Sequence, residues 1–224
     1  MPGRQLIIAD GEYYHVYNRG VARQPIFFSQ RDYAQALLTL TYYLFRNPPM
    51  KLSRYKDLSQ QDRDSIIADQ QKKNDVLAQL IAFVFMPNHI HFLFRQVSDK
   101  GIAKFMSQFQ NSYTRYLNTR HARVGPAFQG AFKAVHVESE EQLLHLTRYI
   151  HLNPVVSHVI TRSELGSYPW SSFRDYVNTS TSFVTRNPVL SAFKSMEKYH
   201  RFVLDYIEYA ERLHQIKHLL LEDP

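Results

Sequence analysis

The stretch LAQLIAFVFMPNHIHFLFR, residues 77–95, decides the fold of this 224-residue chain. Two runs rich in β-branched and aromatic residues flank Pro87-Asn88, a turn-prone pair, so the stretch predicts an antiparallel hairpin. Side chains alternate across a strand, and His89 and His91 therefore point to the same face of the second strand. The hairpin presents two imidazoles side by side.

The segments around this hairpin predict an α+β fold. Aromatic and β-branched runs predict further strands, and apolar residues at helical spacing, opened by capping residues such as Ser29 and Ser139, predict helices. We expect Pro154 to end the last of these helices. The predicted strands cover residues 13–19, 77–86, 89–95 and 131–137, and the predicted helices cover residues 29–44, 101–121 and 139–153.

The order of these elements is βαββαβ followed by one more helix, which predicts a ferredoxin-like sandwich with an antiparallel sheet. In that arrangement helices cover one face of the sheet, and we expect the other face to be free. Residues 1–177 are expected to form this domain, with the polar stretch 50–75 as an insertion. In residues 178–224, apolar side chains from Tyr199 to Ala210 keep a helical period, which predicts a helical C-terminal extension.

The composition narrows the class of protein. Lys and Arg number 27 against 20 Asp and Glu, which gives a net charge of +7 and a pI near 9.5. This balance favours an anionic partner such as nucleic acid. The chain has no cysteine, which excludes a disulfide framework and a thiolate metal site. No stretch reaches the roughly 18 consecutive apolar residues of a membrane span, so we expect a cytoplasmic protein without a membrane partner.

The last predicted core helix carries a second group of polar residues. Its residues His145, Tyr149 and Asn153 are four residues apart and share one face, distinct from the face that carries Leu143 and Ile150. A tyrosine and an amide are thus presented together. A histidine pair on a strand also occurs without a function, so the pair alone does not define a site.

Five stretches between residues 12 and 176 carry a resemblance to a known family. They are YHVYNRGVARQPIFF, FVFMPNHIHFLF, GPAFQGAFKA, LLHLTRYIHLNPVV and YPWSSF. Together and in this order they resemble the HUH single-tyrosine transposases, and within them the REP-associated tyrosine transposases of bacteria. The resemblance leaves the C-terminal extension and the insertion outside.

The resemblance implies roles for four residues. His89 and His91 match the His-hydrophobe-His signature that holds a divalent cation, Mg²⁺ or Mn²⁺, and Tyr149 matches the nucleophile. Asn153 stands where related transposases carry a glutamine as third metal ligand, which keeps the amide oxygen but shortens its reach. Other tyrosines and histidines are not assigned to the site, namely Tyr113, Tyr116, His15, His145 and His151.

DNA binding is expected to depend on basic residues in or near these segments. The resemblance implies single-stranded or hairpin DNA, such as REP-like palindromes, held by phosphate contacts and by stacking of unpaired bases. One departure from the family is Ala131, where an arginine is usual, so that its contact is either missing or supplied by Lys133. The candidate DNA-binding residues are Arg19, Lys104, Arg115, Arg120, Arg123 and Lys133.

Three functions remain open from the sequence. The first is metal-dependent nicking and strand transfer of single-stranded DNA through a 5′-phosphotyrosine, at REP-type hairpins in a bacterial cytoplasm, on the nucleoid, by a monomer or a homodimer. The second is a nucleic-acid-binding module that kept the fold and lost the chemistry. The third is a metal-dependent phosphodiesterase that uses water in place of the tyrosine.

Overall fold

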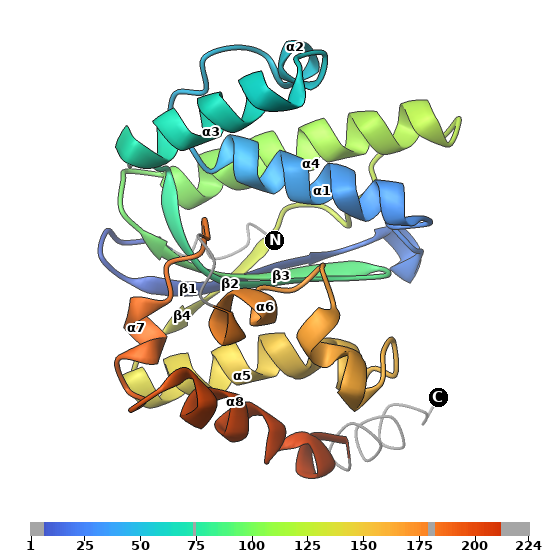
Figure 1. Ribbon diagram of the computed structural model, residues 1–224. Helices are drawn as coiled ribbons and strands as arrows, with labels where there is room; N and C mark the ends of the chain where they lie inside the picture. Colours follow the sequence, from blue (N-terminus) through green and yellow to red (C-terminus); the bar gives the residue numbers. More distant parts are fainter. Residues whose placement is uncertain (1–6, 74, 179–181, 212–224) are drawn as a thin grey trace.

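The computed structural model describes residues 7–73, 75–178 and 182–211, and its centre is one four-stranded antiparallel sheet (Figure 1). The sheet order is β2-β3-β1-β4, and a helix follows β1 and another follows β3, which confirms the ferredoxin-like α+β fold. The predicted hairpin is confirmed, with Pro87 and Asn88 as its turn. The strands are β1 Tyr13–Arg19, β2 Ala78–Met86, β3 His89–Gln96 and β4 Lys133–Val137.

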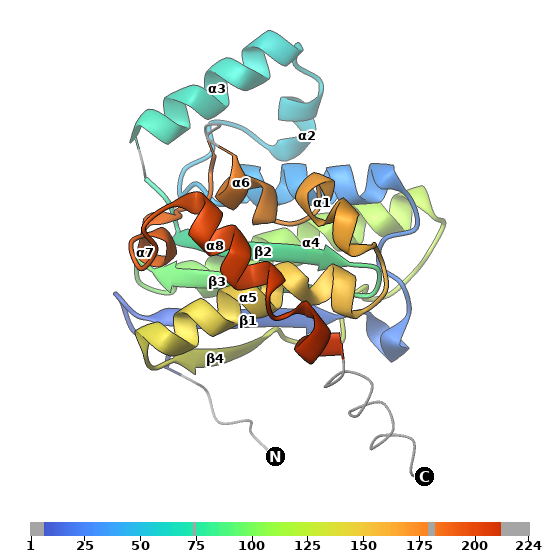
Figure 2. The same cartoon turned by 60° about the horizontal axis from the view of Figure 1, so that its bottom comes forward.

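Helices cover both faces of this sheet. On one face lie α1 (Gln30–Tyr43) and α4 (Gly101–Arg120), and on the other lies α5 (Glu140–Val156) with the C-terminal helices (Figure 2). The other helical elements of the described residues are η1 Val21–Arg23, α2 Leu52–Lys56, α3 Gln60–Lys73, η2 Arg162–Ser167, α6 Phe173–Val177, α7 Asn187–Leu190 and α8 Met196–Leu204.

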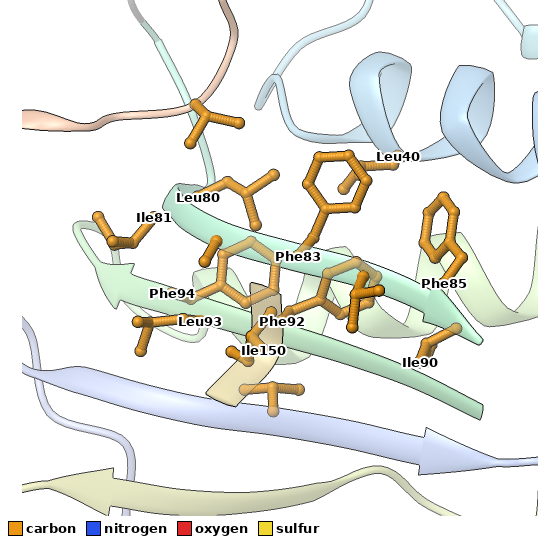
Figure 3. Close-up of a cluster of buried hydrophobic side chains, with 14 of the residues drawn as sticks. Leu40, Leu80, Ile81, Phe83, Phe85, Ile90, Phe92, Leu93, Phe94 and Ile150 are labelled. Carbon is orange, nitrogen blue, oxygen red and sulfur yellow. The ribbon is translucent and has the colours of Figure 1, made fainter. Parts of the chain in front are cut away.

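The expectation of one free sheet face is wrong. All residues of β2 except Gln79 are buried, because α1 and α4 pack on one side of the hairpin and α5 on the other. Figure 3 shows Leu40 of α1 and Ile150 of α5 approaching the hairpin. The nearly continuous apolar run of β2 is the signature of a strand buried on both faces, whereas a half-exposed strand would alternate.

The expectation that Pro154 ends its helix is also wrong. The helix α5 begins at the predicted cap, where Ser139 Oγ accepts a hydrogen bond from the backbone N–H of Gln142 at 3.1 Å, and it runs through Pro154 to Val156. Proline removes one backbone donor and disfavours helical geometry in the residue before it. Leu152, Pro154 and Val155 are buried in the last turn. Because the helix runs to Val156, Asn153 is a helical residue.

The described residues of the stretch 50–75 contain the two helices α2 and α3, which pack outside the main core. Its α2 and α3 rest on α1 through a small separate cluster of Tyr42, Leu52 and Tyr55. An ion pair of 3.0 Å between Arg46 and Asp75 lies at the base of this stretch. The division of the chain into a domain ending at residue 177 and an extension stays a prediction.

The C-terminal extension covers α5. Its apolar period is confirmed for the described part, where Tyr199, Val203 and Ile207 are buried in the core. The remainder of the expected extension, residues 212–224, lies outside the described residues.

Candidate active site

The histidine pair lies on β3 at the centre of the sheet, on the face that α5 covers. In the antiparallel register His91 is opposite Tyr17 and His89 is opposite Arg19, and directly opposed residues share a face. The two imidazole rings lie 5.0 Å apart between centroids and are nearly perpendicular, with an interplanar angle of 86°. The predicted pairing of the two imidazoles on one face is therefore present.

Both imidazoles use Nδ1 in a hydrogen bond. His89 Nδ1 lies 2.7 Å from Asn88 Oδ1, which as a carbonyl oxygen can only accept, so His89 carries its proton on Nδ1. His91 Nδ1 lies 2.8 Å from His15 Nε2 of the neighbouring strand. These contacts orient both rings and leave Nε2 of each ring as the nitrogen that can coordinate a cation.

The surroundings keep the histidines neutral, which is the form that binds metals. Burial lowers the pKa of His89 to about 4, the charge of Arg19 acts in the same direction, and the side chain of Asn153 opposes the shift. His91 is 7% exposed, and its pKa is lowered well below the usual value, first by burial and then by the charges of His89, His15 and Arg19.

The helix α5 brings Tyr149 and Asn153 to this histidine pair. The rings of Tyr149 and His91 are 5.7 Å apart between centroids and perpendicular to one another. Asn153 is 6% exposed, its Oδ1 accepts a hydrogen bond of 3.3 Å from Ser157, and its amide influences the pKa of both His89 and Tyr149. The four residues that the family resemblance singles out thus meet in one place.

Tyr149 is half exposed, and its surroundings shift the pKa of its hydroxyl in both directions. Of the residue, 51% is exposed, so a large partner can reach it from solvent. Loss of water around the phenol raises its pKa, the side chain of Asn153 and the charge of Arg19 lower it, and Tyr17 raises it. The net direction is upward, so the hydroxyl is protonated at neutral pH and needs positive charge to become a nucleophile.

The unassigned tyrosines and histidines have other partners. Tyr113 is fully buried and donates a hydrogen bond of 2.6 Å to the carbonyl of Ile26, and Tyr116 donates to Asp32 at 2.9 Å on the α1–α4 side of the sheet. Two histidines of α5 turn towards the C-terminal extension: His145 contacts Phe202, and His151 hydrogen bonds with Tyr199 and Ser172.

The candidate DNA-binding residues fall into two groups. Arg19 and Lys133 lie on the sheet face that carries His89 and His91. In the sheet register Arg19 stands opposite His89, and Lys133 stands opposite Tyr17. Both side chains are exposed. That Lys133 supplies the contact of the arginine that is usual at position 131 stays a prediction. The second group, Lys104, Arg115, Arg120 and Arg123, lies on or just after α4 on the opposite side of the sheet.

One of the second group already has a structural partner. Arg120 Nε lies 3.2 Å from Oδ1 of Asp32, a carboxylate that is fully buried, and His121 lies equally close to the same oxygen. A buried carboxylate requires such partners. Arg120 therefore stabilises the packing of α4 on α1. To make its predicted contact with DNA, this side chain would have to contact a phosphate while it keeps the ion pair with Asp32.

Sequence reasoning missed two members of the site. His15 and Tyr17 alternate on β1 with the buried Tyr14 and Val16, and their rings stack on His91 with centroids 5.0 and 5.9 Å away. The alternation of β1 shows that His15 and Tyr17 share a face. Their distance from His91 depends on the strand register, which the sequence does not contain.

The described residues contain no group of three or more histidine, cysteine, aspartate or glutamate side chains that could hold a metal ion. A cation at His89 and His91 would consequently need the amide of Asn153, water or substrate oxygens as further ligands. Two oriented imidazoles and an amide fit a divalent ion with open positions.

Among the helices that the structure describes, none combines the length and apolarity needed to span a bilayer.

The sheet, the histidine pair and the helix-borne tyrosine together form the arrangement that the resemblance to transposases implies. Residues 51–153 match the family model described as "Transposase IS200 like", a range that contains all four residues of the site. This match confirms the resemblance to the IS200-like transposases.

A solved structure shares the fold of this chain. A REP-associated tyrosine transposase bound to a REP hairpin superposes with a TM-score of 0.53 at 13% sequence identity, over 84% of this chain and 97% of that one. A bacterial tRNA(His) guanylyltransferase-like protein in complex with GTP reaches a TM-score of 0.41 at 10% identity, over 74% of this chain and 72% of that one. None of the curated proteins compared with the chain is a match.

Proposed function

We propose that this protein nicks single-stranded DNA and transfers the strand through a 5′-phosphotyrosine on Tyr149, with a divalent cation held by His89, His91 and Asn153. The observation that carries the proposal is the half-exposed phenol of Tyr149 beside two neutral, oriented imidazoles. The DNA would be a hairpin-forming strand of the REP type, because the structurally similar REP-associated tyrosine transposase is bound to a REP hairpin. A bacterial cytoplasm, with the nucleoid as the site of action, suits such a substrate.

The phenol needs help at neutral pH because its pKa is raised and because a phosphodiester repels an oxyanion. When bound, Mg²⁺ or Mn²⁺ supplies positive charge that polarises a non-bridging phosphate oxygen. Tyr149 Oη would form a bond to the phosphorus as the bond from phosphorus to the 3′ oxygen breaks. The phenol proton would pass by way of solvent to the released 3′ oxygen, which becomes the 3′ hydroxyl. Arg19, which is exposed on the same sheet face, would bind a neighbouring phosphate.

Rejoining uses the same groups in reverse. The phosphotyrosine is an ester of similar energy to the bond that was broken, so a 3′ hydroxyl can attack it and regenerate the free phenol of Tyr149. Strand transfer therefore needs no nucleotide triphosphate. His89, His91 and Asn153 hold their positions in both directions because the sheet and α5 fix them.

The decisive test replaces Tyr149 by phenylalanine. Wild-type protein with Mn²⁺ and a labelled hairpin oligonucleotide should give a covalent protein–DNA band on a denaturing gel, and Tyr149→Phe should give at least about 10³-fold less, because the attacking oxygen is gone. Binding of the same oligonucleotide should persist. Tyr209→Phe is the matched control, because Tyr209 is 54% exposed and lies far along the chain in the C-terminal extension.

Two results would contradict the proposal. Absence of any covalent band with wild-type protein under Mg²⁺ and Mn²⁺ would leave a DNA-binding module without chemistry. Cleavage that survives Tyr149→Phe and gives no covalent band would show that water is the nucleophile.

A further inference from the structure

A basic cleft of about 860 Å³ lies on the layer of the molecule opposite Tyr149. It is formed by α1, α2 and one side of α4, all of which lie above the sheet in Figure 1 while α5 lies below it. The volume is in the range of ligand-binding clefts. The cleft is therefore separate from the candidate active site, and the nicking chemistry does not account for it.

The cleft is electropositive. Arg31, Lys51, Lys56 and Arg115 line it, and no aspartate or glutamate does. Within the described ranges these four side chains form no ion pair with an acidic residue, whereas the fifth lining cation, Arg120, is held by Asp32 as described above. A concave surface with cations alone concentrates anionic ligands.

The cleft also offers hydrogen bonds and aromatic faces. Gln108 is partly exposed and lines the cleft, but its Oε1 is buried and has no hydrogen-bond partner among the described residues. A buried acceptor without a partner is costly, so a turn of this amide towards the cleft, where a ligand can donate to Oε1, is favoured. Tyr43 and Tyr116 line the same cleft and are partly exposed, and Lys56 lies 5.7 Å from the ring of Tyr116. Asn111 adds an amide to the wall. Cations, amides and aromatic rings together are the chemistry that recognises nucleotides.

We propose that this cleft binds an unpaired segment of a DNA strand, as a second contact separate from the nicking site. Phosphates would contact Lys51, Lys56 and Arg115, and a base would donate a hydrogen bond from its exocyclic amine to Gln108. An unpaired strand is favoured over a duplex because its bases are free to stack on tyrosine and to reach a buried amide. That the ligand is DNA rests on the proposed function.

The cleft explains two features that the nicking site leaves without a role. The polar side of α4 carries Gln108, Asn111 and Arg115 at helical spacing, and this side faces the cleft. The stretch 50–75 supplies Lys51 and Lys56, so this insertion completes the binding surface. A strand held here would flank the segment that Tyr149 attacks on the other layer.

The test measures binding in the Tyr149→Phe background, where no covalent product forms. The probe is a fluorescein-labelled oligothymidylate of about 12 nucleotides, followed by fluorescence anisotropy at several salt concentrations. Lys51→Ala with Lys56→Ala should weaken binding about tenfold and reduce the salt slope by roughly one to two. Lys72→Ala with Lys73→Ala is the matched control, because both lysines are exposed on α3 and lie outside the cleft, and it should bind within about twofold of the parent.

Gln108→Leu separates base recognition from charge. A cytosine-containing probe should bind about threefold more weakly to this variant with an unchanged salt slope, since one hydrogen bond and no cation is lost. The melting temperature should stay equal or rise, because the variant removes a buried acceptor that lacks a partner. A merely structural glutamine would instead lower the melting temperature and leave binding unchanged.

Three outcomes would overturn the proposal that the cleft binds an unpaired DNA strand. The first is that the cleft lysine pair and the control lysine pair weaken binding equally, and the second is that a blunt duplex binds as tightly as a single strand. The third is that polyglutamate competes as effectively as DNA, which would indicate an acidic protein partner. Covalent-band formation by protein that retains Tyr149 tests the proposed function separately. Its failure, together with cleft-dependent binding, would reject the nicking chemistry and keep the cleft.

Discussion

The contact between His15 and His91 shows how single residues prepare this site. His15 Nε2 meets His91 Nδ1 at 2.8 Å, and burial lowers the pKa of His15 to about 4, so His15 is neutral at physiological pH and does not repel a cation. A ligand histidine is usually held by such an outer hydrogen bond, which fixes the ring and its tautomer. His15 is therefore a positioning residue that acts through His91.

Replacing His15 by phenylalanine should weaken Mn²⁺ binding about 10–100-fold, because His91 loses the partner that orients its ring. Isothermal titration of the DNA-free protein with Mn²⁺ measures the effect without any catalytic readout. His136→Phe is the control, since His136 points to the other face of the sheet and binds Glu12 at 2.9 Å. Equal Mn²⁺ affinities for His15→Phe and wild type would show that His91 needs no such support.

The residues of the site were predictable to different degrees. His89 and His91 follow from strand alternation, and Tyr149 and Asn153 follow from helical spacing together with the family resemblance. His15 was not predictable, because 76 residues separate it from His91 and only the pairing of β1 with β3 brings them together. The shared dependence of Arg120 and His121 on buried Asp32 is hidden for the same reason.

At the scale of elements, the C-terminal extension holds α5 on both sides of Tyr149. His151 is fully buried and lies 2.6 Å from the hydroxyl of Tyr199 and 2.8 Å from that of Ser172. Arg148 places its guanidinium 3.7 Å from the ring centroid of Tyr206. These contacts restrain α5 one residue before and two residues after the candidate nucleophile.

The buried His151 should make the stability of this packing depend on pH. Burial lowers the pKa of His151 from 6.5 to about 3, so between these values the unfolded chain binds a proton that the folded chain does not. Stability is therefore fully present above pH 6.5 and falls with acidification, by about 1.4 kcal/mol per pH unit from this residue. From pH 7 to pH 5 the expected loss is roughly 2 kcal/mol.

Urea unfolding of His151→Gln and wild type at both pH values measures this contribution. The variant should be less stable at pH 7 by about 1–3 kcal/mol, because buried hydrogen bonds are weakened, yet it should lose about 2 kcal/mol less than wild type at pH 5. The other shifted histidines titrate in both proteins and cancel in the difference. His200→Gln, at an exposed position of α8, should follow the wild-type pH dependence, and parallel curves for His151→Gln would contradict the argument.

The elements themselves were predictable where a local rule decides them. The hairpin follows from Pro87-Asn88 between two β-prone runs, and the start of α5 follows from the cap at Ser139. The end of α5 did not follow, because packing of Pro154 and Val155 against the core outweighs the local preference of proline. The covered second face was readable in the nearly continuous apolar run of β2, although the βαββαβ order alone suggested otherwise.

At the scale of the whole molecule, one polypeptide carries both parts of the candidate active site. The histidine pair of β3 and Tyr149 of α5 face each other within a single chain, and α5 is anchored by helices of the same chain. No second copy is required to bring the groups together. This arrangement favours a protein that can act as a monomer.

At saturating DNA, the amount of covalent band per protein molecule should therefore stay constant when the protein is diluted about 100-fold. A site within one chain needs no assembly of subunits, and only such an assembly would depend on protein concentration. Mixing Tyr149→Phe with His91→Ala should not restore the covalent band, because neither chain contains a complete site. Recovery of activity in the mixture would show instead that the tyrosine of one chain works with the histidines of another.

The two edge strands of the sheet, β2 at one margin and β4 at the other, differ in whether later chain segments pair with them. Along β2, the backbone N–H of Phe85 donates to the carbonyl of Trp170 at 2.9 Å, and Thr185 donates to Leu80 at 2.8 Å, so later chain segments close that margin. On the opposite margin, β4 carries Val135 at 48% exposure. Val135 stands opposite His15 in the sheet register, and the ring of His15 lies 6.4 Å from that of Tyr149 between centroids. The edge strand nearer the phenol is thus exposed. Under the proposed function a DNA strand would lie across this edge, so that a bond far from either end, even in a circular strand, would be as reachable as one beside a free end.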